Sequence, residues 1–112
     1  MDVTVSMRNK IAVVVVSGRV DALTCKDFSA RLEHEIKAGN HYLVVDLHQV
    51  DFMSSAGVQA LLTAARMARE RAGELCMAGA QPNVKRVIDL SGLDHFAHVY
   101  ADVHSAIDKL SS

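Results

Sequence analysis

Residues 42–62, YLVVDLHQVDFMSSAGVQALL, contain the point at which a predicted strand gives way to a predicted helix. The run YLVVDL, residues 42–47, is apolar and β-branched, which is typical of a strand buried on both faces. Apolar residues then return at helical spacing, and we expect a helix over residues 57–72. Between the two elements the serines Ser54 and Ser55 stand side by side. A strand that leads directly into a helix is the repeating unit of an α/β domain.

Strands and helices alternate along the rest of the chain as well. Two apolar runs near the N-terminus are joined by a short polar turn and predict a hairpin. The expected strands are 3–7, 11–18, 42–47, 73–80 and 97–101, and the expected helices are 25–38, 57–72, 82–91 and 103–110. The sequence therefore predicts a single α/β domain over residues 1–112, with a mixed and largely parallel sheet of about five strands and with about four helices.

Composition excludes several classes of function. The formal net charge is -1, whereas nucleic-acid-binding domains usually carry a basic face, so we expect no nucleic-acid partner. No apolar run reaches the length of a spanning helix and no secretory signal is visible, so we expect no membrane insertion and a cytoplasmic protein. Cys25 and Cys76 form no CxxC pair, and we interpret them as buried thiols in a reducing compartment. His95 and His98 lack a third ligand and no Gly-rich phosphate loop is present, so neither a metal nor a cofactor is expected.

Helical spacing also predicts which faces of two helices are buried. At the start of the first helix, Thr24 and Asp27 resemble a capping box. The buried face of that helix is expected to carry Cys25, Phe28, Leu32 and Ile36. In the helix over 57–72, the face toward the sheet is expected to carry Leu61, Leu62, Ala65, Ala68 and Ala72.

The adjacent serines have three interpretations. Gly57 has no Cβ and allows the helix to approach the strand closely, so one serine lies at or just before the helix N-terminus. It is either an N-cap that accepts a backbone N–H group or an acceptor of phosphate, since a helix N-terminus tolerates an anion. A nucleophile in an enzyme is the third interpretation. It requires the elbow G-x-S-x-G, and Met53 stands where Ser55 would need the first glycine.

The run LVVDLHQVDFMSSAGVQALL resembles the signature of the STAS domain (sulfate transporter and anti-sigma factor antagonist) in its bacterial stand-alone form. That signature has a strand ending in L-D-L, a short loop, then F-M-D-S-[ST]-G-[LV]-G and a helix. Phe52 and Met53 match the loop. Ser55 matches the serine that such proteins present for phosphorylation, and Gly57 matches the glycine that opens the helix. The stretch SGRVDALTCKDF is similar to the family's G-x-[IVL]-D-x-x-[ST] run and implies that Asp21 lies close to the phosphoserine.

Two positions depart from the signature. Ser54 stands where the family has an acid, and Ala56 stands where it has a second hydroxyl residue. Ser54 is therefore an alternative acceptor to Ser55. Asp46 is a further expected neighbour of the site. It either orders the loop before Ser55 by accepting backbone N–H groups or helps to steer the metal-bound nucleotide of a kinase.

The resemblance implies a binding protein that works by partner switching and is not an enzyme. Its unphosphorylated form would bind an anti-sigma factor that is also a serine kinase of the histidine-kinase-like ATPase type, and would release the target of that factor. Phosphorylation at Ser55 would block binding, and a metal-dependent serine phosphatase would restore it. The alternative is a non-phosphorylated scaffolding STAS subunit of a membrane transport or signalling complex, in which Ser55 only caps the helix.

The helix after the serines also predicts where the partner docks. A largely uncharged strip lies opposite the expected core face of that helix and runs down from Ser55. We expect it to pack against the kinase, the alternative being apolar residues merely tolerated on the surface. The expected partner-binding residues are Ala56, Gln59, Ala60, Thr63 and Met67.

Overall fold

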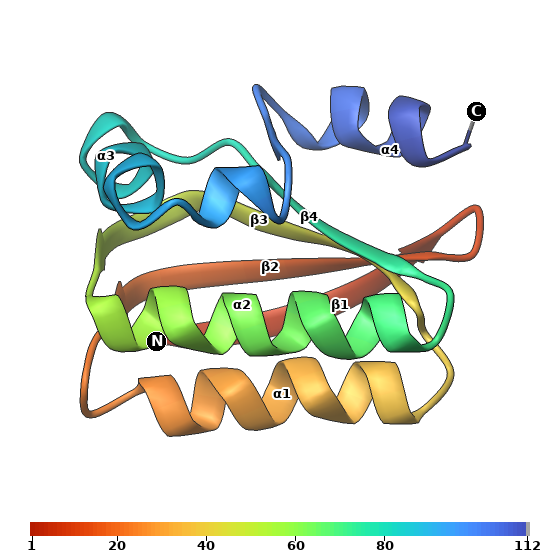
Figure 1. Cartoon of the computed structure of the whole chain (residues 1–112), viewed down its shortest axis with the longest axis horizontal. Coiled ribbons are helices and arrows are strands. Elements are labelled where there is room, and N and C mark those ends of the chain that lie inside the picture. The colour runs from red at the N-terminus through yellow and green to blue at the C-terminus, as the bar shows by residue number, and fades with distance from the viewer. Residues whose placement is uncertain (112) are drawn as a thin grey trace.

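A five-stranded sheet runs through the centre of the structure, a computed structural model that describes residues 1–111 (Figure 1). The elements in chain order are β1 Asp2–Arg8, β2 Ile11–Val20, α1 Cys25–Lys37, β3 Tyr42–Met53, α2 Ser55–Glu70, β4 Glu74–Ala78, α3 Pro82–Ser91, a short 3-10 helix η1 Leu93–His95, β5 Val99–Tyr100 and α4 Val103–Ser111. The strands lie in sequence order, with β1 antiparallel to β2 and all other neighbours parallel. The predicted fold class is confirmed. The last residue of the predicted domain, Ser112, lies outside the described residues.

Helices cover both faces of the sheet (Figure 1). Helices α1 and α2 lie side by side on one face, and the side chains that α3 buries join the same core. Helix α4 covers the other face, where Ala106 and Ile107 pack in a second, smaller core with Cys76 of β4. Neighbouring residues of β3 belong to different cores, because Val44 faces α4 whereas Val45 faces α1 and α2.

Strand β3 is longer than predicted. Phe52 and Met53, which were expected in a loop, are its last residues. The end of β3 pairs with the end of β2, and Val20 lies opposite Met53. The residues HQVD at 48–51 look like a loop because three of them are polar, yet this segment is held in the sheet by a strand far away in the sequence.

Helix α2 begins at Ser55 and ends at Glu70, so both ends lie two residues earlier than predicted. Ala72 is not a core residue, contrary to prediction. It is exposed, and its φ of 60° is a left-handed conformation that follows the helix end. Of the other predicted core residues, Leu62 is half-buried and three are buried: Leu61, Ala65 and Ala68.

The capping box predicted at the start of α1 is not formed. Thr24 makes no side-chain cap bond to the helix. Its hydroxyl instead donates to the carbonyl of Arg19 at 2.9 Å and accepts the N–H group of Asp21 at 2.9 Å. The threonine therefore closes the turn between β2 and α1. The predicted apolar face of the helix is confirmed at three residues, which are fully buried: Phe28, Leu32 and Ile36.

The two cysteines differ in exposure, although both were predicted to be buried. Cys76 lies in β4 and is fully buried. Burial, together with the nearby Glu74 carboxylate, raises the pKa of Cys76 to about 12. Cys25 is only half-buried, because it opens α1 on the side that faces a surface groove. The prediction for Cys25 is therefore wrong.

We expect one thiol per chain to react with Ellman's reagent in the folded protein and both to react in denaturant. The thiolate is the reactive form, and burial keeps Cys76 protonated and out of reach. Counting the released thionitrobenzoate by absorbance tests this. The Cys25→Ser variant should show no reaction until it is unfolded. Rapid reaction of folded Cys25→Ser would show that Cys76 is accessible.

Candidate functional site

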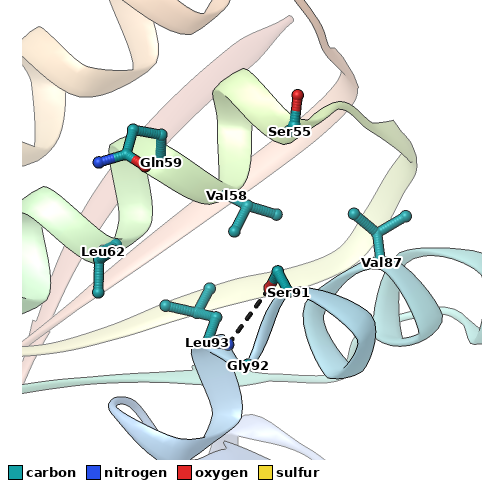
Figure 2. A pocket seen from close by; sticks show the side chains of 8 residues that line it. All are labelled: Ser55, Val58, Gln59, Leu62, Val87, Ser91, Gly92 and Leu93. Carbon is teal, nitrogen blue, oxygen red and sulfur yellow. Dashed lines mark hydrogen bonds between the residues drawn. The ribbon is translucent and has the colours of Figure 1, made fainter.

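Ser55 is the first residue of α2 and lies at the C-terminal ends of the neighbouring strands β2 and β3. The residue is exposed. Figure 2 shows it at one end of a hollow between α2 and α3, with its Oγ directed away from the other residues drawn. The first N–H groups of a helix have no partner within the helix and carry the positive end of its dipole. The Ser55 hydroxyl is therefore accessible to another protein and close to groups that favour an anion.

Ser54 has a different environment from its neighbour. It occupies the N-cap position with an extended backbone, and its N–H group donates to the carbonyl of Val20 at 2.8 Å. Its side chain makes no cap hydrogen bond, and its Oγ is buried without a partner among the described residues. The hydrogen-bonded N-cap, one of the three interpretations of the serines, is therefore not formed at Ser54. Ser55 is an exposed residue, whereas the Oγ of Ser54 is buried.

Gly57 holds the first turn of α2 against the ends of β2 and β3. A Cβ at this position would lie 2.8 Å from Cγ1 of Val20 and 2.9 Å from Cγ of Met53. Both side chains are buried, so neither has free space around it. The close approach predicted for Gly57 is confirmed, although the glycine is the third residue of α2 and does not open it.

Asp21 lies in the turn after β2, at the same sheet edge as Ser54. Its Oδ1 accepts the N–H groups of Leu23 at 3.0 Å and Thr24 at 3.2 Å. Its Oδ2 lies 3.6 Å from Nε of Arg19. The Leu23 N–H bond, and to a lesser extent the Thr24 bonds and the Arg19 charge, hold the pKa of Asp21 below its usual value. The carboxylate thus fixes the turn that follows Val20, whose carbonyl accepts the N–H group of Ser54.

Asp21 is expected to make the stability of the domain depend on pH. Its pKa is lower in the folded than in the unfolded chain, so its contribution is present above the unfolded value and is lost as the pH falls through the folded value. Between about pH 5 and about pH 2, wild type should lose more unfolding free energy than Asp21→Asn. The variant keeps an Oδ1 acceptor for the turn but does not titrate. Urea unfolding of both proteins over this pH range measures the difference. If the unfolding free energies of the two proteins fall in parallel as the pH is lowered, Asp21 is not the source of the pH dependence.

Asp46 is not a neighbour of the serines, contrary to prediction. It lies on the face of the sheet that α4 covers, in a hollow lined also by Asp102 and His104, whereas α2 packs on the opposite face. Its Oδ1 accepts the N–H group of His48 at 3.1 Å and lies 2.7 Å from Nδ1 of the same residue. These contacts brace β3 where its register against β2 shifts. The bond from the His48 N–H group matches one of the two predicted roles of Asp46, but β3 continues to Met53 and so separates the carboxylate from the serines.

The predicted partner-binding strip is divided between the surface and the core. Gln59 and Thr63 are exposed, and Ala56 is half-buried. Ala60 is 7% exposed and belongs to the core, so the prediction that it is an exposed residue is wrong. Met67 is half-buried against the same core. Helix α2 has two packed sides because α1 lies along it, and a helical wheel drawn against the sheet alone misses the second.

Two hollows flank the first turns of α2. On the α1 side, a groove of about 370 Å³ is lined by Cys25, Lys26, Ser29, Ala56, Gln59, Ala60 and Thr63. On the α3 side, a hollow of about 250 Å³ contains Ser55 at its rim (Figure 2). Gln59 borders both. The predicted strip, apart from Met67, therefore lines one hollow, and a second surface adjoins Ser55 on the other side.

The residues that form the far wall of the second hollow were not predicted from the sequence to be part of the site. Val87 of α3 and Leu93 of η1 face Val58 and Leu62 of α2 across it (Figure 2). Val87 is half-buried and packs against the main core. Its spacing of three residues from the fully buried Val84 is a sequence signal that it flanks the core.

Residues 1–111 contain neither a cluster of metal-binding side chains nor a helix that could span a membrane. No group of three or more His, Cys, Asp or Glu side chains is placed to hold a metal ion in this part of the chain. No helix within it combines the length and the apolarity needed to cross a membrane.

The chain is similar to a known protein family and to several curated proteins. A family model described as "STAS domain" matches residues 2–106. The anti-sigma-F factor antagonist RsfB of Mycobacterium tuberculosis is 29% identical over 108 residues, which cover 94% of this chain and 85% of that protein. The anti-sigma F factor antagonist of Paenibacillus polymyxa is 25% identical over 113 residues, which cover 98% of this chain and 97% of that protein.

Among solved structures, the anti-sigma factor antagonist SpoIIAA of Bacillus has the same fold. Its unphosphorylated form superposes with a TM-score of 0.84 at 23% identity, over 98% of this chain and 96% of that chain. Its phosphorylated form superposes with a TM-score of 0.74 at 23% identity, over 96% of this chain and 98% of that chain.

Proposed function

This chain belongs to the STAS domain family, and we propose that it acts as an anti-sigma factor antagonist that switches partners through phosphorylation of Ser55. In this proposal the unphosphorylated protein binds an anti-sigma factor that is also a serine kinase of the histidine-kinase-like ATPase type. Binding releases the target of that factor. The kinase uses ATP to phosphorylate Ser55, and a metal-dependent serine phosphatase removes the phosphate. The names of the relatives support the antagonist role.

The observation that carries the proposal is the exposure of Ser55 at the first turn of α2. A phosphate there would meet unpaired backbone N–H groups and the positive end of the helix dipole, so modification need not unfold the domain. The buried Oγ of Ser54 is a poorer acceptor because a kinase would first have to expose it. We therefore assign the modification to Ser55 and not to Ser54.

The docking surface in this proposal surrounds Ser55. It comprises the groove between α1 and α2 and the hollow between α2 and α3. Gln59 and Thr63 are the exposed members of the predicted strip, whereas Ala60 contributes only the floor of the groove. A phosphate at the rim of a closely packed contact adds nearly two negative charges and must be desolvated, so it opposes docking. In this proposal the protein acts in the cytoplasm.

Affinity capture with a kinase assay tests the proposal. Wild type, Ser55→Glu and Ser105→Glu are immobilised and exposed to an extract of the cells that make the protein. Ser105 is a matched control, since it is an exposed serine in the first turn of α4 on the opposite face. The fraction eluted from each is then assayed for transfer of labelled phosphate to added wild-type chain.

We expect kinase activity in the fractions from wild type and Ser105→Glu and almost none from Ser55→Glu. Equal activity from all three would refute docking at Ser55. A lack of phosphate transfer from any fraction, in an extract active on a control substrate, would favour the scaffolding subunit over the switch.

A further inference from the structure

Strand β1 is a free edge of the sheet. Within residues 1–111 it pairs with β2 alone, and it is seven residues long, whereas the strand at the other edge, β5, has two residues. The outer side of an edge strand carries unpaired N–H and C=O groups, which can pair with another strand. The one side-chain hydrogen bond to the backbone of β1 in the described residues comes from Arg31, whose Nη2 donates to the carbonyl of Val3 at 3.2 Å.

One face of β1 is apolar and incompletely covered. Val3 and Val5 pack on the main core but remain half-buried. Met7 lies on the same face, two residues further on, and is 51% exposed. Side chains at the free edge of a sheet have a neighbour on one side only, and a further strand would cover them.

The sequence of β1, DVTVSMR, is complementary to itself when it is paired antiparallel about Val5. Residue 2 then lies opposite residue 8 of a second copy, so Asp2 faces Arg8 twice across the symmetry axis. In the same register the apolar Val3 faces Met7. Thr4 faces Ser6, so that two hydroxyl residues meet, and Val5 faces Val5 of the second copy. Every opposed pair joins side chains that favour each other. The two residues of a pair have both even or both odd numbers, so their side chains lie on the same face of the sheet.

We propose that β1 is the interface of a homodimer, in which two copies pair through Asp2–Arg8 into a continuous sheet of ten strands, five from each. The charged ends of β1 are available for this contact, since neither Asp2 nor Arg8 forms an ion pair within residues 1–111. The Arg31 bond is compatible with pairing, because a carbonyl oxygen accepts two hydrogen bonds. A single strand is a small interface, so the dimer is expected to be weak and to form at high micromolar concentration.

A pair of charge variants tests this interface. Arg8→Asp would place Asp opposite Asp2 at both ends, and Asp2→Arg would place Arg opposite Arg8 at both ends. Each variant alone repels itself, and like charges directly opposite weaken strand pairing, so we expect about tenfold weaker self-association. An equimolar mixture restores opposite charges in every pair and should associate as well as wild type. Sedimentation velocity at low salt over a concentration series gives the dissociation constants.

Lys10→Asp is the matched control, since it makes a similar change of charge in the exposed turn after β1, outside the paired register. It should self-associate as wild type does. Recovery of the dimer in the mixture also shows that both variants are folded. The proposal is overturned if wild type sediments as a monomer throughout, if the single variants associate like wild type, or if their mixture does not associate.

Discussion

A phosphate on Ser55 is expected to weaken binding of the kinase by several hundredfold, which corresponds to about 3–4 kcal/mol. Ser55 lies at the rim of the hollow between α2 and α3, and the groove beside α1 begins at the next residue of the helix. A partner that covers both must desolvate whatever is attached to the serine. The cost falls on the complex and not on the free domain, because a helix N-terminus accommodates the charge.

Titration of the purified kinase with each form of the protein measures this effect. The phosphorylated protein and Ser55→Glu should both bind more weakly than wild type, the phosphate having the larger effect because it carries more charge. Ser105→Glu should bind like wild type. If phosphorylated and unmodified protein bind equally well, Ser55 lies outside the contact and the switch needs a different explanation.

Replacement of Gly57 by alanine is expected to destabilise the domain by about 1–3 kcal/mol, the usual cost of overpacking a core. In an exposed helix the same change would instead stabilise by about 0.5–1 kcal/mol. Here the new methyl group would lie 2.8 Å from Cγ1 of Val20 and 2.9 Å from Cγ of Met53. Val20 is fully buried and β-branched, so it has little freedom to move.

A double-mutant cycle with Val20→Ala separates this clash from other effects of the substitution. Val20→Ala removes the atom nearest to the new methyl group. Gly57→Ala should therefore cost less in the Val20→Ala background than in wild type, as measured by urea unfolding. If the losses of unfolding free energy caused by Gly57→Ala and Val20→Ala add in the double variant, the contact between α2 and β2 is not the source of the destabilisation.

The order of strands and helices could be predicted because each buried face has its own period in the sequence. Phe28, Leu32 and Ile36 recur at helical spacing, and all three are buried. The prediction for Asp46 failed for a related reason. A single carboxylate between two apolar residues of a strand points away from their core, so alternation alone would have placed it with α4.

The remaining differences come from contacts that are distant in the sequence. The end of β3 is a strand because β2 pairs with it, and Ala60 is buried because α1 lies against α2. Neither contact is encoded in the local pattern around these residues. The exposure of Ser55 and the burial of the Ser54 Oγ also depend on how the first turn of α2 meets the sheet, which the adjacent letters S-S do not distinguish.

The direct test of the switch is to incubate the purified chain with an extract of its own cells and ATP, then to measure intact mass and map the modified residue. Wild type and Ser54→Ala should each gain one phosphate on Ser55, and Ser55→Ala should gain none. If wild type gains no phosphate in an extract that modifies a known substrate, or if the phosphate lies on another residue, Ser55 is not the switch.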